Sequence, residues 1–182
     1  MAKSLRPSRC YHWDSPAYTR VAKDPSSSFI TGIPGSKIFH YTMGNAKKLF
    51  NTEISIISQQ KIQVRHNALE AARITANKKL EKNIGVKNYL FKIRVYPHHV
   101  MRENAIASGA GADRVQTGMR RAFGKPVGRA ARVYIGQKVM SVFLDTGDDE
   151  DENLRTAKSA LKNALLKIPG NMKIVVEKEK SG

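Results

Sequence analysis

The chain of 182 residues is long enough for one domain with a sizeable hydrophobic core. Hydrophobic residues make up 41% of it and charged residues 26%, a balance that excludes wholesale disorder. Its 32 Lys and Arg against 15 Asp and Glu give a net charge of +17. We therefore expect a polyanion as the partner, either nucleic acid or an anionic membrane surface.

Three absences narrow the class of protein further. Cys10 is the only cysteine, which excludes an internal disulfide and indicates a reducing compartment. No apolar run approaches the roughly 18 residues of a membrane span, and the first residues lack the apolar segment of a secretory signal. We expect a cytoplasmic protein that is not held in a membrane.

The first half of the chain predicts an arm, a strand and a helix. Residues 1–52 are rich in Pro, Ser, Gly and aromatics without a sustained period, which predicts an extended basic arm packed through its rings. Residues 53–64 are β-branched and partly alternating, and predict one strand. In the helix that follows, Asn67 and Glu70 resemble a capping box and Gly85 supplies the stop. Its apolar stripe consists of Leu69, Ala72, Ala76 and Leu80.

The second half predicts four more strands and a second helix. Residues 88–97 predict a strand with Arg94 on the face opposite the aromatic side chains, and residues 131–145 predict an antiparallel hairpin that turns at 136–138. A second amphipathic helix is expected from about residue 149, followed by a last strand at 172–178. The apolar stripe of that helix consists of Leu154, Ala157, Leu161, Ala164 and Leu165.

Together these elements predict an α+β fold, a two-layer sandwich of a mixed or antiparallel sheet with two amphipathic helices and an extended basic N-terminal arm. The chain has no repeat, linker or break in composition, so we expect a single domain over 1–182, with the arm at 1–52 and the core at 53–182. Residues 102–112 are small and glycine-rich, which predicts a mobile loop.

Charge is distributed unevenly along the chain. Residues 145–152 hold six acids, whereas residues 114–144 hold seven bases and no acid. The acidic block lacks the order of a calcium-binding loop, and we expect it to cap the second helix, where negative charge meets the positive end of the helix dipole. The remaining surface is left positive.

Known catalytic and metal-binding patterns do not appear. The five histidines are scattered, and Cys10 with His12 has no second ligand pair, so no metal site is expected. Residues 107–114 contain G-x-G without the third glycine of a dinucleotide site or the lysine of a phosphate loop. His98 and His99 follow Pro97 at a strand end, where we expect surface or RNA contact. We expect no catalytic residues and no cofactor.

Residues 116–133, QTGMRRAFGKPVGRAARV, combine arginines with glycines and contain no acid. Arginine binds phosphate in a bidentate manner and stacks on bases, and glycine lets a backbone approach a sugar-phosphate chain. Met119 and Phe123 would anchor the stretch, which favours an ordered basic surface that fits folded RNA. RNA is favoured over DNA because no helix-turn-helix, zinc-finger or basic-zipper pattern is present. An RNA-modifying enzyme and a DNA-compacting protein are the alternatives.

Residues 111–142, GADRVQTGMRRAFGKPVGRAARVYIGQKVMSV, closely resemble the signature of a universal large-subunit ribosomal protein family, called ten-e in archaea and eukaryotes and sixteen in bacteria. RPSRCYHWDSPAYTR (6–20) and GIPGSKIFHYTMGN (32–45) look like its archaeal form. The resemblance implies a structural, non-enzymatic constituent of the large subunit, a monomer within the ribosome beside neighbouring ribosomal proteins. It also implies binding to large-subunit ribosomal RNA near the A-site transfer RNA and the peptidyl transferase centre.

The resemblance also implies which residues meet RNA. Those within the signature are Arg114, Arg120, Arg121, Lys125, Arg129 and Arg132. Charge and context add Arg6, Arg9, Lys37, Arg65 and Arg94. The loop at 102–112 matches the family's loop that points toward the peptidyl transferase centre, with candidate residues Arg102, Glu103, Asn104, Ser108, Gly109 and Gly111.

Overall fold

The computed structural model describes residues 13–19, 22–30, 32–104, 110–111, 118–146 and 150–178. The strands and helices have the following bounds: β1 Thr42–Gly44, β2 Thr52–Ser58, β3 Ile62–Arg65, α1 His66–Asn83, β4 Tyr89–Ile93, β5 His99–Glu103, β6 Lys125–Val133, β7 Lys138–Leu144, α2 Glu150–Leu165 and β8 Met172–Lys178. Short 3₁₀ helices lie at η2 Pro25–Ser27, η3 Val86–Asn88 and η5 Gly118–Arg121.

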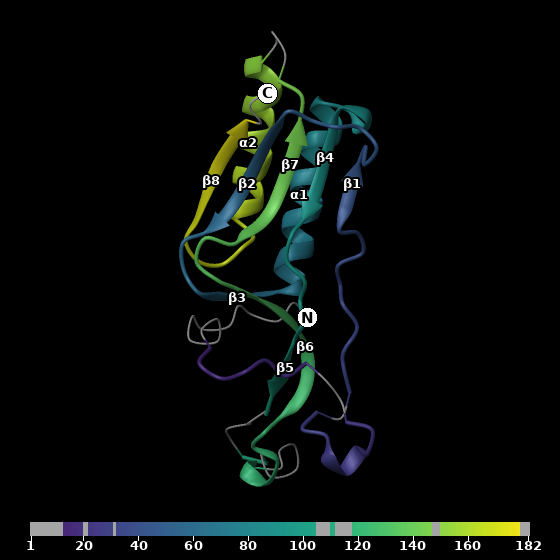
Figure 1. The fold of residues 1–182 in the computed structure, drawn as a ribbon. Coiled ribbons are helices and arrows are strands. Elements are labelled where there is room, and N and C mark those ends of the chain that lie inside the picture. Colours follow the sequence, from purple (N-terminus) through teal and green to yellow (C-terminus); the bar gives the residue numbers. More distant parts are fainter. Residues whose placement is uncertain are drawn as a thin grey trace.

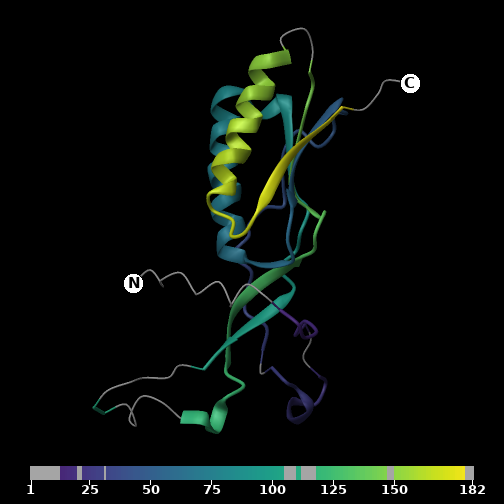
Figure 2. The same cartoon turned by 90° about the vertical axis from the view of Figure 1, so that its left-hand side faces the viewer.

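The strands form two antiparallel sheets that lie at opposite ends of an elongated molecule (Figure 1). One sheet has five strands in the order β1-β4-β7-β2-β8, and the other has three in the order β3-β6-β5. Figure 2 shows α1 and α2 side by side on one face of the five-stranded sheet, while the opposite face is left without a helix. The predicted α+β architecture is confirmed, with two sheets instead of one.

The two sheets are connected where the chain crosses from one to the other. The single strand predicted at 53–64 is in fact β2 and β3, which belong to different sheets, and the predicted hairpin at 131–145 is wrong because β6 and β7 do not pair with each other. Both crossings meet at Ser58: its N–H donates to the carbonyl of Gln137 (3.1 Å) and its carbonyl accepts from Gly136 N–H (2.8 Å). Alternation in the sequence marks strands but does not identify their partners.

The core lies between the helices and the five-stranded sheet. All four residues of the predicted α1 stripe are fully buried, and Ala157, Leu161 and Ala164 of the α2 stripe are buried as well. They pack on the inward side chains of the central strands, among them Ile54 and Phe91. The amphipathic period therefore identified the buried helix faces correctly, because burial follows the 3.6-residue repeat.

The start of α1 differs from the prediction. The helix begins at His66, one residue before the expected cap Asn67, and the Arg65 side chain makes no capping bond. Glu70 instead forms a bidentate ion pair with Arg73, with N–O distances of 2.8 and 2.6 Å. At the other end, Gly85 with a φ of 86° donates its N–H to Leu80, as expected of a helix stop.

A hydrogen-bonded ion network covers the open face of the five-stranded sheet. Glu53 on β2 accepts bonds from Arg94 (2.9 Å) and Lys138 (2.9 Å), and Lys138 also donates to Glu177 on β8 (2.6 Å). The hydroxyl of Ser141 donates to Glu53 at 2.7 Å. These polar groups bond to one another on the face of the sheet that no helix covers.

Gly44 and Gly85 allow a matched test of backbone packing, because their φ angles are 88° and 86°. A Cβ at Gly44 would lie 2.2 Å from the carbonyl oxygen of Tyr89, whereas a Cβ at Gly85 would meet nothing within 4 Å. We expect Gly44→Ala to lower the free energy of unfolding by at least about 2 kcal/mol and Gly85→Ala by about 1 kcal/mol. Urea unfolding of both variants measures the difference, and equal losses would contradict the packing argument.

Candidate nucleic-acid interface

The predicted RNA-facing and loop residues divide into four groups by their placement. Arg6, Arg9, Arg114, Ser108 and Gly109 lie outside the described residues, and only the backbone of Arg121 is described. Arg120 in η5, Lys125 at the start of β6 and Gly111 are exposed at the end of the molecule far from the helices. Lys37, Arg65 and Arg129 lie at the joint between the two sheets, and Arg94 and Arg132 are engaged within the fold.

Three cations from separate parts of the chain gather around the buried His66, the first residue of α1. We call this set (Lys37, Arg65, Arg129 and His66) the basic junction. Burial lowers the pKa of His66, and the charges of Lys37, Arg129 and Arg65 lower it further. Nδ1 of His66 accepts the backbone N–H of Lys37 at 3.3 Å, which requires an unprotonated nitrogen.

The start of α1 and the side chain of Arg129 both contribute positive charge to the junction. The first turn of α1 contains no acid, and its N-cap residue makes no side-chain capping bond, so the positive end of the helix dipole is not neutralised there. The Arg129 Nη1 donates to the Tyr96 hydroxyl at 2.9 Å, and its buried Nε has no hydrogen-bond partner in the described part of the chain. Gly128 lies against the His66 ring, since a Cβ there would be 3.4 Å from Nε2.

Arg132 does not face outward as the sequence prediction required. It is 7% exposed, and its guanidinium donates to Gln63 Oε1 (3.3 Å) and to the carbonyl of Ser15. Its charge also lies 5.3 Å from the ring centre of Trp13. The side chain therefore fixes the N-terminal segment to the three-stranded sheet, because the fork of Arg satisfies acceptors on both.

Arg94 is also committed within the protein, since it pairs with Glu53 and stacks 5.4 Å from the ring centre of Phe143. His99, expected at the surface, is 8% exposed. Burial, together with the nearby Arg132 charge, lowers the pKa of His99 to about 4. Its Nδ1 accepts the backbone N–H of Tyr18 at 3.1 Å, so the ring anchors the arm instead of meeting solvent.

The predicted mobile loop at 102–112 is a strand at its start, and residues 105–109 and 112 lie outside the described residues. Arg102 and Glu103 belong to β5, which pairs with β6, and Asn104 Nδ2 donates to the carbonyl of Gly118 at 3.2 Å. Arg102 lies 3.8 Å from the ring centre of Phe123 and donates to its carbonyl at 2.6 Å. The two ends of the segment 105–117 are thus fastened to each other.

Contacts among aromatic rings and cations fix the N-terminal arm to the three-stranded sheet. The sequence indicated them only through the aromatic residues of the arm. Tyr18 packs edge-on against Phe123 with ring centres 5.4 Å apart, and Arg102 lies 4.4 Å from the centre of the Tyr18 ring. Farther along, Trp13 meets Tyr134 at 5.7 Å and Lys61 at 4.8 Å. Cation–π and edge-on contacts of this kind contribute roughly 0.5–1.5 kcal/mol each.

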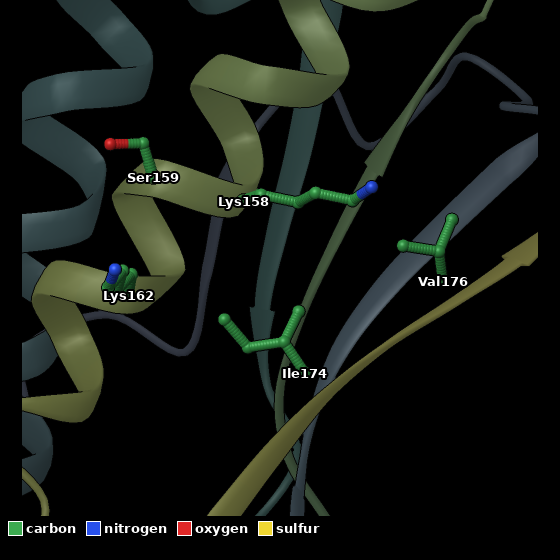
Figure 3. Close-up of a pocket in the computed structure, with 5 residues that line it drawn as sticks. All are labelled: Lys158, Ser159, Lys162, Ile174 and Val176. Carbon is green, nitrogen blue, oxygen red and sulfur yellow. The ribbon is translucent and has the colours of Figure 1, made fainter.

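One open hollow lies between α2 and β8, away from the basic junction. It is lined by Lys158, Ser159, Lys162, Ile174 and Val176. Figure 3 shows Lys158 extending from α2 toward β8. Its lining offers no carboxylate or imidazole for acid–base catalysis, and the described residues contain no group of three potential metal ligands. In the same described residues, no helix is long and apolar enough to cross a membrane.

A basic α+β protein with cations gathered at a joint and at one end is typical of proteins that bind a polyanion by shape and charge. Similarity to known proteins defines the class more narrowly. The family model of ribosomal protein L16p/L10e matches residues 14–175, and the chain belongs to this family. This membership confirms the expected resemblance and the non-enzymatic class, because the family consists of structural ribosomal proteins.

Curated relatives match along nearly the whole chain. The large ribosomal subunit protein uL16 of Staphylothermus marinus is 47% identical over 179 residues, which covers 98% of this chain and 97% of that protein. The uL16 proteins of Archaeoglobus fulgidus and Methanococcus aeolicus are 44% and 46% identical, over 95% and 96% of this chain and 93% and 95% of their own lengths.

Proposed function

We propose that the protein is a structural constituent of the large ribosomal subunit that binds ribosomal RNA near the A-site transfer RNA and the peptidyl transferase centre. Its relatives carry the name of a large-subunit protein, and the resemblance of residues 111–142 favours this position in the subunit. Its action is neutralisation of phosphates together with a fit of shape, with no chemical turnover.

The observation that carries the RNA contact is the basic junction. Cations far apart in the sequence converge on the uncapped start of α1, where helix dipole and side chains attract an anion together. Lysine contributes a point charge and the arginines contribute forked donors that match phosphate geometry.

Exposed cations at the far end extend this surface. Arg120 belongs to η5 and Lys125 begins β6, at the end of the three-stranded sheet opposite the helices (Figure 1). The junction and the far end together form an elongated basic surface, which suits contact with several RNA segments at once. Arg121 and Arg114 belong to the same proposal through the sequence signature alone.

A salt titration tests the phosphate contacts at the junction. We expect the triple variant Lys37→Ala, Arg65→Ala, Arg129→Ala to reduce affinity for in vitro transcribed archaeal large-subunit RNA by about 100-fold or more, and the slope of log K against log salt by roughly 2 to 3. The reason is that each lost phosphate contact releases about one fewer counterion. The matched control changes three exposed lysines of the helical layer, namely Lys78, Lys82 and Lys162.

Because control and test variants lose the same net charge, general electrostatics affects them equally. A slope reduced equally in both would show that only total charge matters and would contradict a localised site. Equal affinity of the native protein for random duplex DNA would favour the DNA-compacting alternative over the ribosomal one.

A further inference from the structure

We propose that Phe29 is a stacking platform for one unpaired nucleobase of ribosomal RNA, with Arg120 and Lys125 binding the adjoining phosphates. The inference rests on the proposed function and names a contact that the resemblance does not include. The ring of Phe29 is 78% exposed, although the segment that carries it is held in place by buried and hydrogen-bonded neighbours.

The residues that precede and follow Phe29 in the chain are both held in place. Ile30, the next residue, is 2% exposed and fixes the backbone in the protein. On the other side, the hydroxyl of Ser28 accepts the backbone N–H of Ala22 at 3.0 Å, and Ser27 N–H donates to Asp24 at 3.0 Å. The exposed ring therefore has a defined position instead of sampling solvent freely, and a pre-positioned ring loses less entropy when a ligand stacks on it.

Phe29 is also the outer end of a series of aromatic contacts. Its ring lies 6.5 Å from that of Phe123 at an interplanar angle of 36°, and Phe123 is covered in turn by Arg102 and Tyr18. Among the described residues, Phe123 and Tyr18 each contact two rings, whereas Phe29 contacts one. A nucleobase stacked on Phe29 would continue the series, as planar bases do on aromatic side chains of RNA-binding proteins.

Positive charge on both sequence sides of Phe123, the ring that contacts Phe29, indicates a nucleotide as the occupant. Arg120 and Lys125 are exposed and stand three residues before and two after Phe123 in the sequence. Met119 beside them is 74% exposed. An unpaired nucleotide presents an apolar face and an anionic phosphate together, which complements exposed apolar groups placed among cations. An apolar side chain of a neighbouring protein would use the ring but leave the cations without a counter-charge.

The chain offers a close control in Phe39, which is 79% exposed and has no ring contact within the described residues. We expect Phe29→Ala to reduce affinity for in vitro transcribed archaeal large-subunit RNA about tenfold with an unchanged salt slope, because the lost contact carries no charge. Phe29→Trp should restore binding, and Phe39→Ala should change it less than twofold. Thermal melting by circular dichroism verifies that all variants are folded.

A second readout reports stacking directly. We expect the native protein to quench the fluorescence of a short oligoadenylate that contains 2-aminopurine, and Phe29→Ala to lose most of that quenching under saturating conditions. Equal affinity and quenching for the Phe29 and Phe39 variants would overturn the proposal. Normal RNA binding by Phe29→Ala with impaired incorporation into reconstituted subunits would also overturn it, in favour of a protein contact.

The two proposals fail in different ways. If native protein binds the large-subunit RNA no better than random duplex DNA, the proposed function fails and the stacking site with it. If the junction variant shows its reduced salt slope while Phe29→Ala behaves as native, only the stacking site is wrong.

Discussion

Replacing Glu53 by Gln is expected to lower the free energy of unfolding by about 3 kcal/mol at pH 7. The carboxylate is 17% exposed and is paired with Arg94 and Lys138, each at 2.9 Å. Burial by itself would raise the pKa of Glu53, but hydrogen bonds from Ser141, Lys138, Ser55 and Arg94 outweigh it and hold the pKa at about 2. An amide of the same shape leaves two cations on the open sheet face without their counter-charge.

The pKa of Glu53 also determines how this difference depends on pH. The folded-state pKa of about 2 lies below the ordinary value of 4.5, so the unfolded chain binds the proton more readily. The stabilisation is therefore fully present above about pH 5 and is lost as the pH falls from there toward 2. Urea unfolding from pH 7 to 3 should show native protein and Glu53→Gln converging at low pH.

Glu177→Gln is the matched control for Glu53. Glu177 accepts from the same lysine at 2.6 Å, but its side chain is 49% exposed. Solvent screens such a pair, and we expect a loss of at most about 1 kcal/mol with little dependence on pH. If both variants lost the same stability at pH 7, the network would derive its strength from Lys138 alone and not from the buried carboxylate.

Replacing Arg132 by Ala is expected to cost about 3 kcal/mol and to release the N-terminal segment from the three-stranded sheet. The guanidinium donates to Gln63 and to the carbonyl of Ser15, and it lies over the ring of Trp13. Truncation removes these hydrogen bonds at a position where the side chain is only 7% exposed. Denaturant unfolding measures the loss. The amide of Tyr18 donates to His99, and the amide of Val100 donates to the carbonyl of Tyr18 at 2.9 Å, so hydrogen exchange at these two amides reports whether the segment detaches.

Two further variants test whether the forked guanidinium of Arg132 is the cause of the stabilisation. Arg132→Lys keeps the charge but not the fork, and should retain less than half of the stabilisation because a single ammonium cannot reach separate acceptors in one plane. Lys125→Ala on the same strand is exposed and should change stability by less than about 0.5 kcal/mol. Faster exchange at Tyr18 in Lys125→Ala as well would contradict a specific role for Arg132.

The candidate site could be predicted from the sequence only in part. The abundance of Arg and Lys was evident, and Lys37, Arg65 and Arg129 were each singled out, but nothing in their spacing indicated that they meet at His66. Arg132 was assigned to the same outward surface as its neighbours, yet its side chain points into the protein. Charge favours the surface on average, and only the position of a partner such as Ser15 reveals an exception.

Both helices with their buried stripes, the last strand, the basic character and the family can be predicted from the sequence, because they depend on local periodicity, composition and motifs. The assignment of β2 and β3, and likewise of β6 and β7, to different sheets becomes evident only in the fold. The fold also shows that Arg94 and Arg132 hold other parts of the protein, whereas Lys37, Arg65 and Arg129 gather around His66. Strand partners and side-chain burial depend on contacts between residues far apart in the chain, about which local patterns carry no information.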